Sequence, residues 1–142
     1  MNTTTHLDYR SPPGPLHAIL LAGTVPLFLG ALLSDITYFQ TYQIQWSNFA
    51  SWLIAGALVF AGFSLLWSVI DLFRAGRRGN RAVPYFVVLL VTWVLGFINA
   101  LVHAKDAWAI MPASLILSLV VFVLACAAAW FGLSTVRTGD VA

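Results

Sequence analysis

Four long apolar stretches, separated by polar segments, constrain this chain more than any other feature of its sequence. Crossing about 30 Å of hydrocarbon takes roughly 20 apolar residues in a helical conformation. Within lipid only helices and closed barrels satisfy their backbone hydrogen bonds, and these stretches are continuously apolar rather than alternating. The sequence therefore predicts membrane-spanning helices near residues 16–33, 49–70, 83–102 and 110–133.

The connections between these stretches are short, so consecutive helices should pack against each other in antiparallel pairs. The first two connections have about a dozen residues each, and the third is shorter. We therefore predict an all-α fold over residues 16–135, an integral membrane four-helix bundle of antiparallel hairpins. Polar tails flank it at residues 1–15 and 136–142.

Small residues repeat at four-residue spacing within the apolar stretches, which places them on one face of each helix. Lipid provides no hydrophobic drive between helices, so close packing of small side chains has to hold a bundle together. The same faces would serve equally in a homo-oligomer, and both interpretations stay open. The pairs are Gly30 with Ser34, Ala57 with Ala61, Ser114 with Ser118, Ala125 with Ala129, and Ala128 with Gly132.

Charged residues make up 8% of the chain, against about 25% in soluble domains, so a water-facing surface cannot be built. The formal net charge of +2 is too small for the clustered basic surface that nucleic-acid binding needs. The sequence has no HExxH motif, cysteine cluster, phosphate-binding glycine loop or Ser–His–Asp arrangement. These features exclude soluble enzymes and nucleic-acid partners, and they favour a non-catalytic protein in a lipid bilayer.

Basic residues lie almost entirely on one side of the predicted bundle. Four spans place the N-terminus, the second connection and the C-terminus on that side, and Lys105 alone on the other. Because basic loops stay in the cytoplasm, both termini should be cytoplasmic. The second connection should anchor the protein to anionic headgroups through Arg74, Arg77, Arg78 and Arg81. The basic residues of the cytoplasmic side are Arg10, Arg74, Arg77, Arg78, Arg81 and Arg137.

Polar side chains gather on the opposite, outer side, where each needs a partner or a purpose near the bilayer. Asn99, His103 and Asp106 share one helix face if the third helix continues that far. Asp35 ends the first span at the same depth. This outer polar patch is consistent with a cap that stabilises the helix ends or docks a partner. It is also consistent with a metal site of His103, Asp106 and Asp35, in which a carboxylate orients the imidazole.

A haem held by two histidines is not expected within one chain. His17 begins the first span and His103 ends the third, so they lie at opposite faces of the bilayer, roughly 30 Å apart. His6, in the N-terminal tail, lies on the side of His17. Two axial nitrogens on one iron are separated by only about 4 Å. No cofactor is therefore predicted, and haem or a metal ion at His103 is kept as the alternative.

Aromatic residues also gather on the outer side, at Tyr38, Phe39, Tyr42, Trp46 and Trp108. Such rings favour the headgroup region, because one end of the side chain is apolar and the other can contact water. The sequence therefore favours an interfacial belt, and a stacking platform for an aromatic ligand is the alternative.

Several short motifs resemble those of a known family. They are Pro15-Leu16-His17, Pro26, Gly-Ala-Leu-Leu-Ser-Asp at residues 30–35, the segment 98–108, and Ala129-Trp130-Phe131-Gly132. From about Pro15 to Gly139 the chain is similar to the domain-of-unknown-function 2231 family of small bacterial four-helix membrane proteins. It lacks the second histidine beside His17, and the histidine after the fourth helix, that many relatives carry.

The resemblance implies a multi-pass protein of the bacterial cytoplasmic (inner) membrane without an established activity. Relatives are sometimes fused to, or encoded beside, redox proteins such as Rieske-type or quinoprotein dehydrogenase domains. We therefore expect a non-catalytic anchor or accessory subunit of a membrane or periplasmic redox complex. The alternatives are a haem- or metal-binding redox unit centred on His103 and a small transporter. A transporter needs charge near the bilayer midplane, whereas the charged residues here fall at the boundaries.

Overall fold

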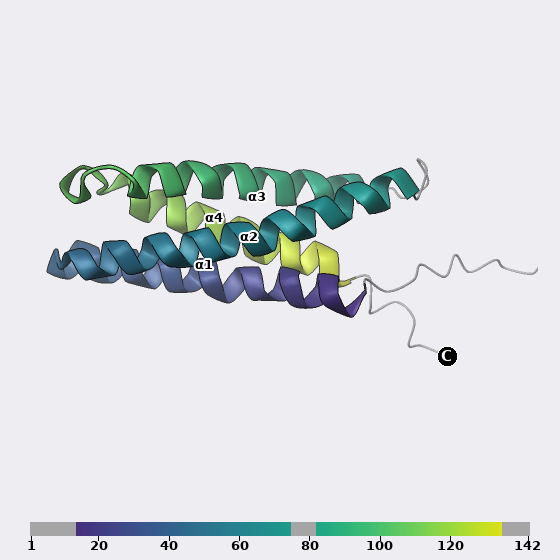
Figure 1. Ribbon diagram of the computed structural model, residues 1–142, viewed down its shortest axis with the longest axis horizontal. Helices are drawn as coiled ribbons and strands as arrows, with labels where there is room; N and C mark the ends of the chain where they lie inside the picture. The colour runs from purple at the N-terminus through teal and green to yellow at the C-terminus, as the bar shows by residue number, and fades with distance from the viewer. Residues whose placement is uncertain (1–13, 75–81, 135–142) are drawn as a thin grey trace, which may run out of the picture.

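Four long helices and one short 3-10 helix form the part of the chain that the structure, a computed structural model, describes: residues 14–74 and 82–134 (Figure 1). No strand occurs within these residues, so the predicted all-α class is confirmed. The elements are α1 (Pro15–Thr41), α2 (Ile44–Arg74), α3 (Ala82–His103), the 3-10 helix η1 (Ala107–Ala109) and α4 (Ala113–Leu133).

The helices pack as a closed circle, in which each contacts its neighbours in the chain and α4 returns to contact α1. α1 and α3 therefore face each other across the diagonal of the bundle. We call the end with the α1–α2 and α3–α4 turns the hairpin end (Figure 1). The opposite end, with the start of α1 and the end of α4, is the termini end. Consecutive helices run in opposite directions, which confirms the predicted antiparallel hairpins.

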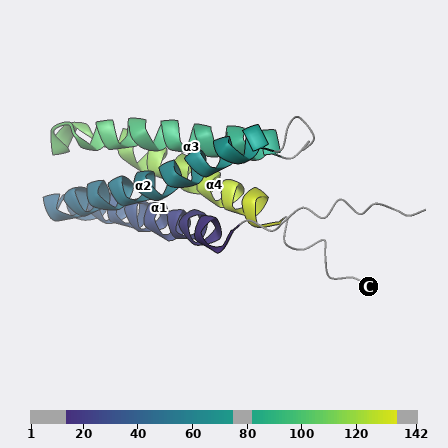
Figure 2. The same cartoon turned by 45° about the vertical axis from the view of Figure 1, so that its right-hand side comes forward.

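α2 leans across the bundle instead of running parallel to its neighbours. In both Figure 1 and Figure 2 it starts beside α1 at the hairpin end and reaches α3 at the termini end. Near the middle of both helices, Trp93 Nε1 of α3 donates a 3.2 Å hydrogen bond to the Leu58 carbonyl of α2. Toward the hairpin end the two helices diverge.

Each of the four long helices α1 to α4 is long and apolar enough to cross a membrane. Their outward faces carry large apolar side chains such as Ile19, Phe63 and Val123, which are 65%, 56% and 56% exposed. An apolar surface of this extent is unsuited to water and matches the hydrocarbon of a bilayer. The multi-pass membrane bundle is thus confirmed, and the cytoplasmic location of both termini stays a prediction from the arginine distribution.

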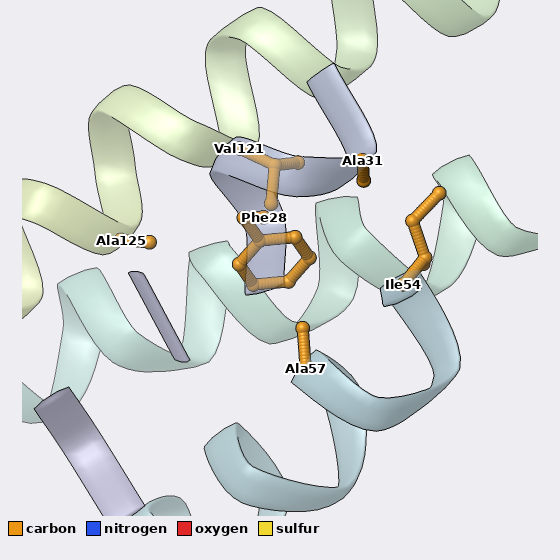
Figure 3. Close-up of a cluster of buried hydrophobic side chains, with 6 residues drawn as sticks. All are labelled: Phe28, Ala31, Ile54, Ala57, Val121 and Ala125. Atoms are coloured by element: carbon orange, nitrogen blue, oxygen red, sulfur yellow. The ribbon is translucent and has the colours of Figure 1, made fainter. Parts of the chain in front are cut away.

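Small side chains let the helices approach closely around the bundle axis. Figure 3 shows the ring of Phe28 from α1 among Ala57 of α2 and Val121 and Ala125 of α4. These four residues are at most 2% exposed. The predicted small-residue contacts are therefore made largely within one chain. The buried members of those pairs are Ser34, Ala57, Ala61, Ser114, Ser118, Ala125 and Ala128.

The connection between α1 and α2 is shorter than predicted. α1 continues past Leu33 to Thr41, and only Tyr42 and Gln43 precede α2, where the sequence predicts about a dozen connecting residues. A helix does not have to end where the hydrocarbon ends, because its backbone bonds are internal in lipid and water alike. No glycine or proline interrupts residues 34–43, and α1 ends where Tyr42 adopts a left-handed conformation with φ 52°.

The remaining helix bounds lie closer to the predicted spans. α2 begins earlier, at Ile44, and α3 agrees with its predicted span to within one residue at each end. α4 begins at Ala113 because the residues before it form η1 and a turn. Most of the two predicted polar tails, residues 1–13 and 136–142, lies outside the described residues.

Tyr38 lies on the extension of α1 and is not part of an interfacial belt. It is 2% exposed, and its hydroxyl donates a 2.9 Å hydrogen bond to the carbonyl of Ala107 in η1. Phe39 and Tyr42 are exposed, and the ring of Tyr42 stacks on that of Trp108 with 6.0 Å between centroids. Tyr38 therefore joins α1 to η1, while Phe39, Tyr42 and Trp108 are exposed at the surface.

Replacement of Gly132 by alanine should destabilise the bundle. The added Cβ would clash with a side-chain carbon of buried Leu21 and lie 2.9 Å from Cε2 of Tyr85. Overpacking of this kind costs about 1–3 kcal/mol. We expect a lower thermal unfolding temperature for Gly132→Ala in detergent, followed by circular dichroism.

The matched control is Gly56→Ala, because its Cβ would lie 3.8 Å from Leu27, an ordinary contact distance. This variant should unfold at the temperature of the unsubstituted protein or above it, since alanine favours helix more than glycine does. Equal losses in both variants would contradict the packing described for α4.

Candidate functional site

Four polar side chains from three helices meet at the hairpin end. Asp35 lies on α1, Asn99 and His103 on α3, and Ser118 on α4. All four are buried: Asp35 and Asn99 are 0% exposed, Ser118 is 1% exposed and His103 is 8% exposed. Hydrogen bonds join them into one group, which we call the polar ring.

The hydrogen bonds of the polar ring form a closed circuit. Asn99 Nδ2 donates to Ser118 Oγ at 2.8 Å, and Ser118 Oγ donates to Asp35 Oδ2 at 2.5 Å. The other carboxyl oxygen, Asp35 Oδ1, lies 2.8 Å from His103 Nε2. His103 Nδ1 lies 2.9 Å from the backbone carbonyl oxygen of Asn99, and this contact closes the circuit.

The chemistry of donors and acceptors determines where the protons of the polar ring lie. A backbone carbonyl only accepts, so His103 Nδ1 carries a hydrogen and donates it to Asn99. The contact between His103 Nε2 and Asp35 Oδ1 then holds one further proton. Whether that proton is on nitrogen or on oxygen, the total charge of the two side chains is zero. Such a pair is tolerated inside a membrane-spanning bundle, where an unpaired charge would be costly.

The groups capable of acid–base chemistry are occupied within the polar ring. Both nitrogens of His103 and both carboxyl oxygens of Asp35 have hydrogen-bond partners, so neither residue can act on a substrate without breaking a bond of the circuit. Outside this acid–base pair, the amide oxygen Asn99 Oδ1 is buried and has no hydrogen-bond partner among the described residues. The arrangement is therefore a cross-link between α1, α3 and α4.

Asp106 does not join the polar ring, although the sequence predicts it in the same patch. α3 ends at His103, so the helix face that would have carried Asp106 inward is not formed, and Asp106 is exposed. Within residues 14–74 and 82–134, no three His, Cys, Asp or Glu side chains lie close enough together to hold a metal ion. The structure thus brings Asp35 and His103 together and does not add Asp106 as a third ligand.

Ser118 is the member of the polar ring that does not belong to the outer polar patch predicted from the sequence. The sequence marks Ser118 only as a small residue on a closely packed helix face. A hydroxyl on such a face needs a partner in lipid, and this requirement is the signal that could have pointed to a buried acceptor. That the acceptor is Asp35 depends on how α4 is rotated against α1, which the spacing within α4 does not encode.

A second polar contact joins α1 and α3 at the termini end. The hydroxyl of Tyr85 lies 3.0 Å from His17 Nε2, and His17 is 4% exposed. The ring of Trp67 from α2 lies 6.3 Å from that of His17, measured between centroids. His17 Nδ1 is buried without a hydrogen-bond partner among the described residues. Polar side chains therefore link α1 to α3 near both ends of the bundle.

His17 and His103 lie at opposite ends of the bundle, as predicted. His17 contacts Tyr85, whereas His103 contacts Asp35. At roughly 1.5 Å per residue along α1, His17 and Asp35 are about 27 Å apart. One haem iron cannot bind both histidines of a single chain across that distance.

The predicted headgroup anchor falls on the described residues only at Arg74. Arg74 is the last residue of α2 and is exposed at the termini end, where it can reach lipid headgroups. Arg77, Arg78 and Arg81 lie outside the described residues, so the anchor stays a prediction.

Comparison with known proteins gives a match over nearly the whole chain. A family model with the description "Predicted membrane protein (DUF2231)" matches residues 13–142, which include all four long helices. No curated protein and no solved structure matches the chain.

Removing one member of the polar ring should lower the free energy of unfolding more than removing the exposed charge of Asp106 outside it. His103→Leu leaves the buried carboxyl of Asp35 with Ser118 as its remaining partner, at a cost of about 2–3 kcal/mol. The double variant Asp35→Leu/His103→Leu should recover part of that loss, because it leaves no unpaired carboxyl in the bundle. Thermal unfolding in detergent measures both effects.

Asp106→Ala is the control, since Asp106 is exposed and lies outside the polar ring. Its unfolding free energy should change by less than about 0.5 kcal/mol. If Asp106→Ala lost as much unfolding free energy as His103→Leu, Asp106 would belong to the same stabilising group as His103. That result would refute the conclusion that Asp106 lies outside the polar ring.

Proposed function

The chain belongs to the DUF2231 family of predicted membrane proteins, and we propose that it is a non-catalytic anchor or accessory subunit of a membrane or periplasmic redox complex. The observation that carries this proposal is the closed circuit of the polar ring. Asp35 and His103, the residues best suited to chemistry at the hairpin end, are used to hold helices together. A bundle that uses its buried acid and base in this way suits support of a partner better than a reaction of its own.

The redox part of the proposal rests on the resemblance stated for the sequence. Relatives that are fused to, or encoded beside, Rieske-type or quinoprotein dehydrogenase domains suggest a partner of that kind. We assign the docking role to the exposed side of the hairpin end. Asp106 is exposed there, and Trp108, two residues further on, is 76% exposed.

We place the protein in the bacterial cytoplasmic (inner) membrane, with both termini in the cytoplasm and the hairpin end facing the periplasm. The support is the arginine distribution, which leaves Lys105 as the single basic residue of the hairpin end. In this orientation a periplasmic redox partner meets Asp106 and Trp108.

A haem- or metal-binding unit centred on His103 is less compatible with the geometry. A metal would need one imidazole nitrogen, and each is engaged, Nδ1 with Asn99 and Nε2 with Asp35. Metal binding would therefore have to open the polar ring, with a loss of its cross-link.

Purification from native membranes in mild detergent tests the accessory role. We expect the tagged protein to co-purify at constant stoichiometry with a partner that carries the visible absorption of haem, flavin or an iron–sulfur cluster. The charge reversal Asp106→Arg should reduce the recovered partner by about tenfold, as expected for a change at the edge of a docking surface. Its matched control is Asp71→Arg, which reverses an exposed charge on α2 near the termini end.

Two results would contradict the proposal. One is recovery of the chain alone, as a monomer or a homo-oligomer, from membranes of the native host. The other is a metal or chromophore that stays with the isolated chain and is lost in His103→Ala.

Labelling of single cysteines tests the orientation. In a Cys126→Ala background, Asp106→Cys should react with a membrane-impermeant maleimide in intact spheroplasts. Arg137→Cys should react only after the membrane is permeabilised, because the arginine-rich side faces the cytoplasm. The opposite pattern would invert the proposed topology.

A further inference from the structure

An open cavity of about 370 Å³ lies at the hairpin end. The helices α2 and α3 diverge at this end of the bundle (Figure 1). Its lining combines residues from the start of α2 with residues from the end of α3 and the segment after it. The polar lining residues are Gln45, Ser47, Asn48, Ser51, His103 and Lys105. The volume falls within the range of about 300–1,000 Å³ typical of small-molecule pockets.

Several polar groups of this cavity have no partner within the described part of the chain. Lys105 is exposed and lines the cavity, and it forms no ion pair with a described residue. Ser47 is only 5% exposed, and its hydroxyl takes part in no hydrogen bond with a described residue. The side chain of Asn48 is equally unpaired. These groups differ from the polar ring next to them, in which nearly every donor and acceptor is matched.

The charge of the cavity selects the kind of ligand. No carboxylate lines it: Asp106 lies between the lining residues Lys105 and Ala107 in the sequence, but it is exposed and is not itself a lining residue. Asp35 is bonded to His103 and Ser118 and is 0% exposed, so it does not compete for Lys105. An ammonium group, a hydroxyl and an amide together offer donors to a negatively charged oxygen. The cavity therefore fits an oxyanion of the phosphate class.

The place of the cavity in the membrane indicates where such a phosphate comes from. The stacked rings of Tyr42 and Trp108 lie at the same end of the bundle, and aromatic rings of this kind mark the headgroup layer. Ile44 lines the cavity and is 67% exposed, which gives the opening an apolar edge.

We propose that this cavity binds the phosphate headgroup of an anionic phospholipid. Lys105 neutralises the phosphate charge, and Ser47 and Asn48 donate hydrogen bonds to its oxygens. The site is separate from the predicted arginine anchor, whose described member, Arg74, lies at the termini end. It is also independent of the accessory role proposed above.

Native mass spectrometry of the detergent-solubilised protein tests the site, with phosphatidylglycerol and phosphatidylcholine as probes. The arginine anchor also attracts anionic lipid, so all variants carry glutamine at Arg74, Arg77, Arg78 and Arg81. In this background Lys105→Gln should weaken phosphatidylglycerol binding by about tenfold, the effect of losing one charge-assisted hydrogen bond. Lys105→Arg should retain the binding, and Ser47→Ala should weaken it less than Lys105→Gln.

The matched charge control is Asp106→Asn, which removes a neighbouring charge that does not line the cavity. It should leave phosphatidylglycerol binding unchanged or slightly tighter, because the local potential becomes more positive. Phosphatidylcholine should bind weakly and equally to all variants. Equal phosphatidylglycerol binding by Lys105→Gln and its parent would overturn the proposal.

Inorganic phosphate distinguishes the two sources of the oxyanion. Added at the concentration of the lipid, it should leave phosphatidylglycerol in place, because the lipid also gains apolar contacts at the mouth of the cavity. Displacement of the lipid by phosphate at equal concentration would identify the site as one for a free anion and overturn the assignment to a lipid. Thermal unfolding of each variant confirms that the fold is kept.

Discussion

Hydrogen bonds across the diagonal of the bundle join the two helices that helix packing leaves apart. α1 and α3 are not neighbours in the circle of helices, yet Asp35 meets His103 at the hairpin end and His17 meets Tyr85 at the termini end. In lipid, apolar side chains gain little by contacting each other instead of lipid chains. Directional polar contacts therefore set which faces of α1 and α3 point inward, and the rest of the packing follows from them.

The apolar core fills the space that these contacts define. Phe28 of α1 packs among residues of α2 and α4, and alanines at Ala57 and Ala125 leave room for its ring. α3 approaches the same ring through Gly96, where an added Cβ would lie 3.1 Å from Phe28 Cζ. One large ring surrounded by small residues thus keeps the diagonal helices at the distance at which the side chains of Asp35 and His103 can meet.

The hairpin end contains two kinds of polar groups, and the difference between them carries the functional argument. In the polar ring, the protons and lone pairs of Asp35 and His103 are engaged inside the bundle, which suits a structural role. Ser47 and Lys105, which line the cavity together with His103, have no such partners in the described chain. Groups that a protein leaves unpaired at the headgroup layer are available to lipids or to other proteins.

The sequence by itself determined the solvent, the number of spans and the common depth of Asp35 and His103. Continuous apolar stretches can only be helices in lipid, and counting spans places these two residues at one depth. Only the tertiary structure decided that Ser118 completes the polar ring, that Asp106 stays outside, and that α2 leans away from α3 at the hairpin end. Those features depend on where a helix stops and how it is rotated against distant partners. Periodicity along a single helix carries no information about either.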